Sequence, residues 1–534
     1  MKYILNLAIL VFVFSIKVIG QNSFNYAVEL DPVDISDLPG LHSYAFGQHE
    51  GKWLIIGGRK DGMHARQPMF SFPQSQNNAD IYVVDINAQQ FWSASLDVLP
   101  AGLKEQLQST NMNFYQEHDT LYIIGGYAYS ASANQHITFP NLTSIQVNPV
   151  INAIINGESI APFIKQISDP VFAITGGQLG KIDNTFYLVG GQKFDGLYNP
   201  MGGPTFTQTY SNQIRKFTID NSGSQLSYGN YDTVTDEVHL RRRDYNLLPQ
   251  IFPDGSEGYT ISSGVFQANV DLPFLYPVDI NASGYTPITT FNQYLSNYHS
   301  AKAALFDSSN NEMHSLFFGG MSQYYYQNGN LIQDDQVPFV KTISRLTRFS
   351  NGELQEFELP VEMPGLKGAS AEFIPNNSLP HYPSEIIKLS SITQDTMLIG
   401  HIYGGITSPT LNPFSNFQTS TTSADPTIYA VKLIRNAPVS VQKIDGNNPY
   451  TLSVYPNPVI SEFTVEFNLD QLSEIYFFLT NTKGQIINQG SIYAIDIGMN
   501  KRTIKIERSI PPQSLFITVI FDGKFFISKQ IRKE

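Results

Sequence analysis

Five segments along the chain repeat one pattern, in which a short apolar strand follows a turn and ends in two adjacent glycines. The glycine pairs end at Gly58, Gly126, Gly191, Gly320 and Gly405, and a weaker copy with a single glycine ends at Gly264. Neighbouring copies lie 56 to 85 residues apart, which exceeds the 40 to 50 residues common in repeated four-stranded units. The chain is therefore expected to form an array of similar small sheets with long inserted loops.

The residues before each copy favour turns, as a hairpin leading into the apolar strand requires. Examples are His49-Glu50-Gly51 and Asp183-Asn184. The composition agrees with a strand-rich fold, since 42% of the residues are hydrophobic, 13% are aromatic and only 15% are charged. The alternative that these features leave open is an irregular β-sandwich with glycine-rich turns.

The repeated pattern resembles the kelch repeat, a four-stranded β-propeller blade whose second strand ends in a glycine pair. The family also has a tyrosine in the third strand and a tryptophan in the fourth, and only the first copy has both, as Tyr82 and Trp92. The resemblance covers about residues 24–435. It implies an all-β fold, with a six-bladed kelch-like β-propeller over residues 21–435.

Closure of the ring can be predicted from the last copy. Residues 429–435 are expected to form the third strand of the final blade, after which the chain leaves the repeat. Residues 25–30 are then expected to supply the missing fourth strand, so that no long sheet edge stays exposed. The sequence contains no cysteine, and stability must come from the core and from closed edges rather than from disulfides.

The first 20 residues have the pattern of a secretory signal peptide. A lysine precedes an apolar stretch over residues 4–14, and residues 15–20 lead to a polar segment that opens at Gln21. The apolar stretch is too short for a transmembrane helix, and no later segment offers about 18 uninterrupted apolar residues. We expect an exported chain without a transmembrane segment.

The end of the chain differs in pattern from the repeat. A polar linker over residues 436–450 leads to residues 451–534, which open with Tyr455-Pro456-Asn457-Pro458 and end in the basic segment 529–533. This part resembles the type A sorting domain of the bacterial type IX secretion system, found in secreted proteins of Bacteroidetes. The resemblance implies a small C-terminal β-sandwich, the type IX machinery as a partner, and a protein that is secreted or placed on the outer cell surface through the periplasm.

Charge and residue usage exclude several classes of function. The formal net charge of -13 disfavours nucleic acid as a partner. The ten histidines are scattered and no HExxH spacing occurs, so neither a metal site nor a cofactor is expected. The kelch-containing enzyme galactose oxidase needs a cysteine joined to a tyrosine for its radical cofactor, and a chain without cysteine cannot form it.

Long loops after the glycine pairs, at residues 59, 192, 321 and 406, are rich in aromatic residues, Asn, Gln and Gly. They should emerge on the same face as the connections between blades, because consecutive strands reverse direction. Polar residues also stand where the innermost strands should begin, namely at His42, Arg243, Asp244, His299 and Lys367. We therefore predict one polar depression on this face, with a ligand-binding site formed by Arg59, His64, Arg243, Asp244 and His299.

The chemistry of these residues favours an anionic or hydroxyl-rich ligand, since arginine forks bind carboxylates and rings offer flat apolar faces. The alternatives are loops that only pack on each other and an Arg/Asp network that ties blades together. We expect a binding protein that recognises glycan or protein ligands rather than an enzyme. The rival hypothesis is a sugar-modifying enzyme resembling the kelch-type sialate epimerases or mutarotases, with Arg243, Asp244 and His299 in acid, base and clamp roles. The fold does not choose between the two.

Overall fold

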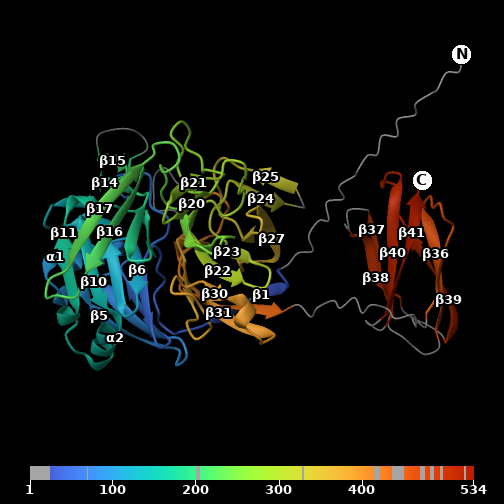
Figure 1. Cartoon of the computed structure of the whole chain (residues 1–534), viewed down its shortest axis with the longest axis horizontal. Coiled ribbons are helices and arrows are strands. Elements are labelled where there is room, and N and C mark those ends of the chain that lie inside the picture. Colours follow the sequence, from blue (N-terminus) through green and yellow to red (C-terminus); the bar gives the residue numbers. More distant parts are fainter. Residues whose placement is uncertain are drawn as a thin grey trace, which may run out of the picture. The chain divides into compact units, whose positions relative to one another are not determined.

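The computed structural model describes residues 24–68, 70–199, 205–327, 330–413, 421–435, 450–469, 475–481, 486–492, 497–521 and 525–534. The expected signal peptide and residues 436–449 of the expected linker lie outside the described residues. The chain divides into two compact units after Asn436, and each unit is described by itself (Figure 1).

The described part of the first unit contains six antiparallel sheets in which four strands lie side by side in series. The first three sheets comprise β2 (Ala45–His49), β3 (Lys52–Ile56), β4 (Asp80–Asp85) and β5 (Gln90–Ser95); β6 (Asn113–Glu117), β7 (Thr120–Ile124), β10 (Asn141–Gln146) and β11 (Ile164–Ser168); and β12 (Gln178–Ile182), β13 (Thr185–Val189), β16 (Gln213–Asp220) and β17 (Ser227–Thr235). The other three comprise β18 (Asn246–Ile251), β19 (Glu257–Ser262), β20 (Val278–Asn281) and β21 (Gly284–Pro287); β22 (Ala301–Asp307), β23 (Glu312–Phe318), β26 (Thr342–Arg348) and β27 (Leu354–Glu362); and β29 (Glu372–Pro375), β31 (Thr396–Tyr403), β34 (Ile428–Arg435) and β1 (Tyr26–Val33).

The sixth sheet takes its outer strand from the start of the described chain. β1 runs antiparallel to β34, with Tyr26 opposite Arg435 and Val33 opposite Ile428. Figure 1 shows the blue β1 beside the orange strands of the last sheet. This pairing confirms the predicted closure, in which residues 429–435 form the third strand of the final sheet and the N-terminal segment forms the fourth.

The glycine pairs lie where the second strand of one sheet approaches the next sheet. Gly125 has a φ of +68°, and a Cβ atom on it would lie 1.8 Å from the carbonyl oxygen of Ile174. Gly404 repeats this between the sixth sheet and the first, where an added Cβ would lie 2.1 Å from the Leu41 carbonyl oxygen. Only glycine combines this backbone conformation with so close an approach, and for this reason the pattern recurs from sheet to sheet.

Six backbone hydrogen bonds join the sheets in a closed cycle, which we call the backbone ring. Each member stands just before the first strand of its sheet, and each amide donates to the carbonyl oxygen of a member in a neighbouring sheet at 2.8 to 3.1 Å. In order of donation the members are Ser43, Ser370, His299, Asp244, Gly176, Asn111 and again Ser43. The cycle closes the first unit on itself, and the fold is all-β and β-propeller-like.

Several elements are added to this frame. Three segments that follow the glycine motifs form separate hairpins, β8 (Tyr127–Ser130) with β9 (Gln135–Thr138), β14 (Gln192–Gly196) with β15 (Phe206–Tyr210), and β24 (Tyr324–Gln327) with β25 (Asn330–Gln333). A further small sheet joins β28 (Leu366–Ala369), β32 (Ile406–Ser408) and β33 (Ser423–Ala424), and β30 (Ile387–Lys388) adds a parallel strand to β22. The described α-helices are α1 (Ala101–Leu107) and α2 (Val147–Asn156). Neither is long and apolar enough to cross a membrane.

The described part of the second unit consists of two antiparallel sheets. One contains β35 (Leu452–Tyr455), β36 (Glu462–Leu469) and β39 (Gly498–Lys505), and the other contains β38 (Ile486–Ile492), β37 (Ile475–Asn481), β40 (Gln513–Phe521) and β41 (Phe525–Lys533). Strands of both sheets contribute to one hydrophobic cluster, which includes Phe463, Phe467 and Phe521. The alternation of buried and exposed residues along β36 and β40 is the pattern of strands with one face in a core.

The opening motif of the second unit lies against its last strand. The side chain of Asn457 donates to the Gln530 carbonyl oxygen at 3.1 Å and accepts from the Arg532 amide at 2.8 Å. Two backbone bonds between Val459 and the chain end continue the pairing. The Tyr-Pro-Asn-Pro segment and the basic terminus, which are 71 to 78 residues apart in the sequence, therefore form one surface.

Candidate ligand-binding site

The segments after the glycine motifs and the starts of the inner strands lie together. In four of the sheets, the residue after the glycine motif bridges to a residue just before the first strand. These bridges are His42 with Arg59, Thr110 with Tyr127, Thr175 with Gln192, and Arg243 with Val265. The expectation that both features share one face is confirmed, and we call that side of the first unit the loop face.

Arg242, the middle of three consecutive arginines, is a structural residue. Its side chain is fully buried, and it donates to the carbonyl oxygens of His239 at 2.9 Å and of Ser263 and Tyr276 at 2.7 Å. Its guanidinium carbon lies 4.2 Å from the ring centre of Phe274. Burial lowers its pKa to about 10. These contacts tie the start of the fourth sheet to its own inner strands.

Arg241 and Arg243 contact the ring of Tyr210, which comes from the separate β14–β15 hairpin between β13 and β16 of the third sheet. Their guanidinium carbons lie 3.7 Å and 6.0 Å from the centre of that ring, and Arg243 Nε donates to the Tyr210 hydroxyl at 3.1 Å. Arg243 is also paired with Asp244, whereas Arg241 donates to the carbonyl oxygen of Phe266 at 2.6 Å. Both arginines are half-buried. We call Arg241, Tyr210 and Arg243 the arginine pair.

The three arginines alternate in burial, since Arg242 is fully buried and Arg241 and Arg243 are half-buried. Arg241 and Arg243 point one way and Arg242 points the other. The triplet therefore contains both of the roles considered from the sequence, a tie within the fold at Arg242 and surface cations at the other two positions.

Arg59 stabilises its own loop. Its side chain is 2% exposed, and its nitrogen atoms donate to both carboxylate oxygens of Asp61 at 2.8 and 2.6 Å, to Asn77 at 2.8 Å and to the Pro73 carbonyl oxygen at 3.4 Å. The guanidinium carbon lies 5.3 Å from the ring centre of Phe72. Its donors are therefore used within the segment 59–77.

His64 lies close to both Arg59 and Arg243. Its ring stacks on Phe72 at 4.5 Å and meets the edge of Tyr198 at 5.0 Å. Burial, aided by the positive charges of Arg243 and Arg59, lowers the pKa of His64 to about 4. The imidazole is neutral near pH 7. Its Nδ1 atom donates to the Ala65 carbonyl oxygen at 3.0 Å, so that Nε2 is left as an acceptor.

His299 belongs to the backbone ring next to Asp244, but its side chain points to the neighbouring sheet. Its Nε2 atom lies 3.1 Å from a carboxylate oxygen of Glu372. Lys302 lies 3.9 Å from the other oxygen of the same carboxylate. Lys367, another polar residue that the sequence suggested at the start of an inner strand, is paired with Asp425 at 2.7 Å.

The five residues predicted from the sequence are thus gathered in three places. Arg243 and Asp244 are paired, and His64 lies within electrostatic range of both Arg59 and Arg243. The His299 ring points elsewhere, with Nε2 at 3.1 Å from a Glu372 carboxylate oxygen.

The run of arginines 241–243 stood out in the sequence as a possible carboxylate clamp, but sequence reasoning missed Tyr210, Tyr198 and Tyr298 as individual members. The Tyr298 ring lies 6.5 Å from that of Phe266, whose carbonyl oxygen accepts from Arg241. The one feature of the sequence that pointed to the tyrosines was the aromatic content of the loops, and this content does not show which residue each tyrosine contacts.

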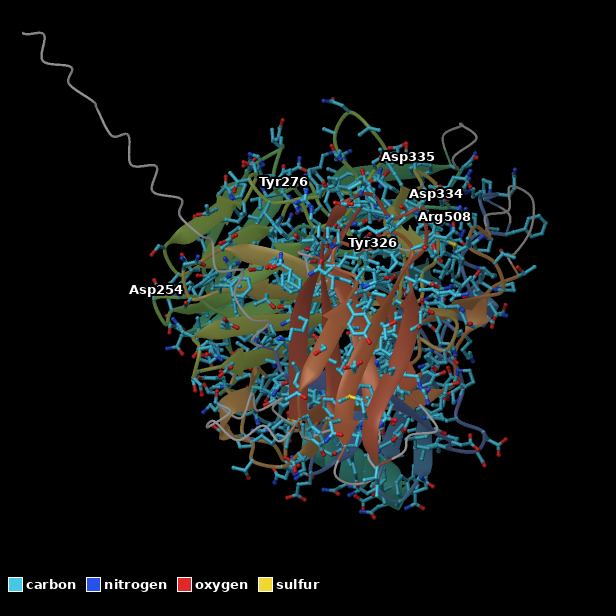
Figure 2. The ribbon with its side chains drawn as sticks, turned by 90° about the vertical axis from the view of Figure 1, so that its right-hand side faces the viewer. Asp254, Tyr276, Tyr326, Asp334, Asp335 and Arg508 are labelled. Atoms are coloured by element: carbon cyan, nitrogen blue, oxygen red, sulfur yellow. The ribbon has the colours of Figure 1, made fainter. Side chains whose placement is uncertain are left out.

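A cavity lies elsewhere in the first unit, among residues of the described chain. It measures about 830 Å³ and is lined by the turns at the far ends of the inner strands, including Tyr115, Lys181 and Asp254. Figure 2 labels Asp254. Lys181 is paired with Glu117, and the loop between β29 and β31 contributes Glu385, whose φ is +64° and whose pKa is raised by burial.

A smaller groove lies at the outer strand of the fifth sheet, and we call it the tyrosine groove. It measures about 220 Å³ and is lined by side chains from the segment 291–295, from the β24–β25 hairpin and from β27. The lining residues are Phe291, Asn292, Tyr294, Leu295, Tyr326, Leu331, Leu354, Gln355, Glu356 and Glu358.

Glu356 should make the stability of the protein depend on pH. Burial raises its pKa to about 8, so the folded protein keeps the proton that the unfolded chain releases near pH 4.5. Stability is then expected to fall as the pH rises from about 4.5 to 8, by about 1.4 kcal/mol for each unit of pKa difference at most. Urea unfolding at pH 5 and pH 8 measures this slope.

The matched control for this prediction is Glu353→Gln, a change at an exposed glutamate just before the same strand. Glu356→Gln should flatten the pH slope, and Glu353→Gln should leave it as in the wild type. Equal slopes in the wild type and in Glu356→Gln would contradict the prediction.

Among the described residues, no group of three or more His, Asp and Glu side chains is spaced to hold a metal ion. No protein-family model matches the chain, and no curated protein sequence matches it. Among solved structures, the structure of YjhT is similar with 12% identity and a TM-score of 0.40, over 73% of this chain and 100% of that one.

Two further solved structures are similar at lower scores. An exo-1,5-alpha-L-arabinanase from a bovine ruminal metagenomic library has 9% identity and a TM-score of 0.28, over 61% of this chain and 99% of that one. A glycoside hydrolase family 43 arabinoxylan arabinofuranohydrolase from Bacillus subtilis, in complex with cellotetraose, has 10% identity and a TM-score of 0.28, over 93% and 95% of the two chains.

Proposed function

We propose that the protein is a secreted or cell-surface binding protein that takes an anionic, hydroxyl-rich glycan or protein ligand on its loop face. Its architecture is a six-bladed kelch-like propeller followed by a small C-terminal β-sandwich that directs type IX export. The observation that carries the binding proposal is the arginine pair, in which two half-buried guanidinium groups share one tyrosine ring.

The charge of the arginine pair favours an anion. Asp244 neutralises Arg243, and Arg241 donates to carbonyl oxygens rather than to a carboxylate. One positive charge therefore remains at this place in a chain of net charge -13. A ligand carboxylate can accept two parallel bonds from a guanidinium fork. The rings of Tyr198, Tyr210 and Tyr298 supply apolar faces and hydroxyl groups beside it.

Arg59, His64 and His299 have supporting roles in this proposal. Arg59 holds the segment 59–77 in shape through Asp61 and Asn77. The neutral His64 donates from Nδ1 to the Ala65 carbonyl oxygen, and its Nε2 atom can accept from a ligand hydroxyl. The His299 amide fixes the backbone next to Asp244. The Tyr-Pro-Asn-Pro segment and the basic terminus, which lie together in the second unit, support one recognition surface for the type IX machinery.

The arginines offer an internal test of the binding proposal. Arg241→Ala and Arg243→Ala should each weaken binding of a carboxylated sugar about 10- to 100-fold, because a hydrogen bond to a charged group contributes about 1.5 to 3 kcal/mol. Arg242→Ala should instead lower the melting temperature sharply, since it removes a fully buried side chain and leaves one buried and two partly buried carbonyl oxygens without their donor. Glycan arrays with N-acetylneuraminate and glucuronate termini, followed by calorimetry, measure the first effect.

Retention of the wild-type affinity by both Arg241→Ala and Arg243→Ala would exclude the arginine pair as the binding site. The His299–Glu372 pair is the observation that favours the rival, because a histidine held by a carboxylate is suited to proton transfer. NMR exchange spectroscopy on N-acetylneuraminate separates the two functions. Exchange between anomers faster than in buffer would make the protein an enzyme, whereas retention without exchange supports a binding protein.

A further inference from the structure

The tyrosine groove lies apart from the arginine pair and is made by other elements. Its walls are the β24–β25 hairpin, the outer strand β27 and the segment 291–295, all near or within the fifth sheet. Figure 1 shows the labels of β24, β25 and β27 close together, and Figure 2 labels Tyr326. The arginine pair, in contrast, joins the third sheet to the fourth.

Tyr294 is held firmly at the groove by contacts on every side. Its amide donates to Glu356 at 2.8 Å, and its carbonyl oxygen accepts from the Ser322 hydroxyl at 3.0 Å. Its own hydroxyl accepts from the Asn292 amide at 3.3 Å, and its ring meets that of Tyr324 at 4.8 Å and 67°. The ring is therefore fixed before any ligand arrives, which lowers the entropic cost of binding.

Tyr326 and Leu331 form an apolar wall that faces solvent. They lie opposite each other in the β24–β25 hairpin, and they are 42% and 39% exposed. Large apolar side chains that stay exposed next to a groove mark an interaction site more often than scattered ones do. The flat ring of Tyr326 suits the apolar face of another ring.

The remaining walls are acidic or neutral. Glu356 and Glu358 contribute carboxyl groups, Asn292 and Gln355 contribute amides, and none of the lining residues is Lys, Arg or His. Because Glu356 keeps its proton up to about pH 8, Glu358 is the lining carboxyl group left to repel a negatively charged ligand, and no lining side chain attracts one. Neighbouring hydroxyl groups can donate in pairs to a carboxylate or to an amide oxygen. The volume of about 220 Å³ is below that of sites for drug-sized ligands and suits one small ring.

From this combination we propose that the tyrosine groove binds an uncharged sugar ring, stacked on Tyr326, with its hydroxyl groups bonded to Glu358 and Gln355. This site is separate from the proposed function of the arginine pair and takes ligands of a different charge. The chain then carries two glycan sites of complementary preference, one for carboxylated and one for neutral sugars.

The experiment uses the full chain and a panel of neutral tetrasaccharides of glucose, xylose, arabinose and galactose. Saturation-transfer NMR finds the bound sugar and calorimetry measures its affinity. Tyr326→Ala is expected to weaken binding at least tenfold, Tyr326→Trp to preserve it, and Glu358→Gln to weaken it several-fold. Tyr231→Ala, at a tyrosine that is 40% exposed in the third sheet, should have no effect.

Arg243→Ala separates this proposal from the preceding one. It should leave neutral-sugar binding unchanged, and Tyr326→Ala should leave binding of carboxylated sugars unchanged. The groove proposal is overturned if no neutral sugar of the panel binds the wild type, or if Tyr326→Ala binds as tightly as the wild type does. Loss of neutral-sugar binding in Arg243→Ala alone would assign that ligand to the arginine pair.

Discussion

Removal of residues 24–33 is expected to prevent stable folding of the first unit. These residues include all of β1, whose eight positions pair with β34. They also contribute Phe24 and Val28 to the hydrophobic cluster shared by the fifth and sixth sheets. Loss of the strand exposes one edge of β34 and opens that cluster. The cost should approach the stability of a whole domain, about 5 to 15 kcal/mol, and aggregation on expression is the expected result.

Point variants separate the loss of packing from the loss of chain length. Val28→Asp puts a charge into the cluster and should reproduce most of the effect of the deletion. Glu29→Ala changes a neighbouring side chain that is half exposed and lies 3.6 Å from Lys432. It should leave the melting temperature almost unchanged, because exposed ion pairs contribute little. A deletion variant that melts at the wild-type temperature would show that β1 does not close the ring.

Truncation after Arg435 is expected to separate folding from export. The chain divides into two compact units after Asn436, and the sheets of the first unit are complete within residues 26–435. The truncated chain should therefore unfold in one cooperative transition close to that of the first unit in the full chain. In its own host it should accumulate in the periplasm and be absent from the medium and the cell surface, as immunoblots of the cell fractions would show.

Asn457→Ala tests export without removing any domain. It deletes both side-chain bonds between the Tyr-Pro-Asn-Pro segment and β41, and export should fall while the first unit melts as before. Asn468→Ala, at an exposed asparagine in β36 of the same unit, serves as the control. Arrival of the truncated chain in the medium at wild-type levels would contradict the sorting proposal.

The order of the sheets could be predicted because each glycine pair stands where the backbone conformation and the neighbouring sheet admit only glycine. At Gly125 and Gly404 the backbone has a positive φ and meets a carbonyl oxygen of the next sheet, and no other residue type satisfies both conditions. The glycine pair therefore recurs in five copies, although a tyrosine and a tryptophan at the expected strand positions occur together only in the first copy. The closing strand could be predicted because the last sheet lacked one strand and the chain offered one apolar segment near its start.

The loop hairpins could not be predicted in the same way. The β14–β15 and β24–β25 hairpins have few buried positions, so the alternation of apolar and polar residues that marks a strand is weak there. The loop between β29 and β31 has little strand pattern of its own, and its short β30 gains its partner, β22, from another sheet. Such pairings depend on tertiary contacts that the local sequence does not encode.

The candidate site was predictable in its location but not in its partners. The sequence placed polar residues at the starts of the inner strands, and the bridges on the loop face bring them beside the long loops. It could not show that Arg59 would be used by Asp61, or that His299 would face Glu372. Residues 61 and 372 are 2 and 73 positions from their partners, and only the packed fold determines which carboxylate reaches which cation.

The backbone ring determines how the first unit can come apart. In an open stack of repeats, the terminal repeat can fray while its neighbours stay folded, because it has only one neighbour. Each member of the ring both donates to one sheet and accepts from another, so no sheet is terminal. Opening any one of them leaves an unpaired amide on one side and an unpaired carbonyl oxygen on the other. Each of the six sheets is thus bonded to two others, and a state with one sheet unfolded and the other five folded is high in free energy.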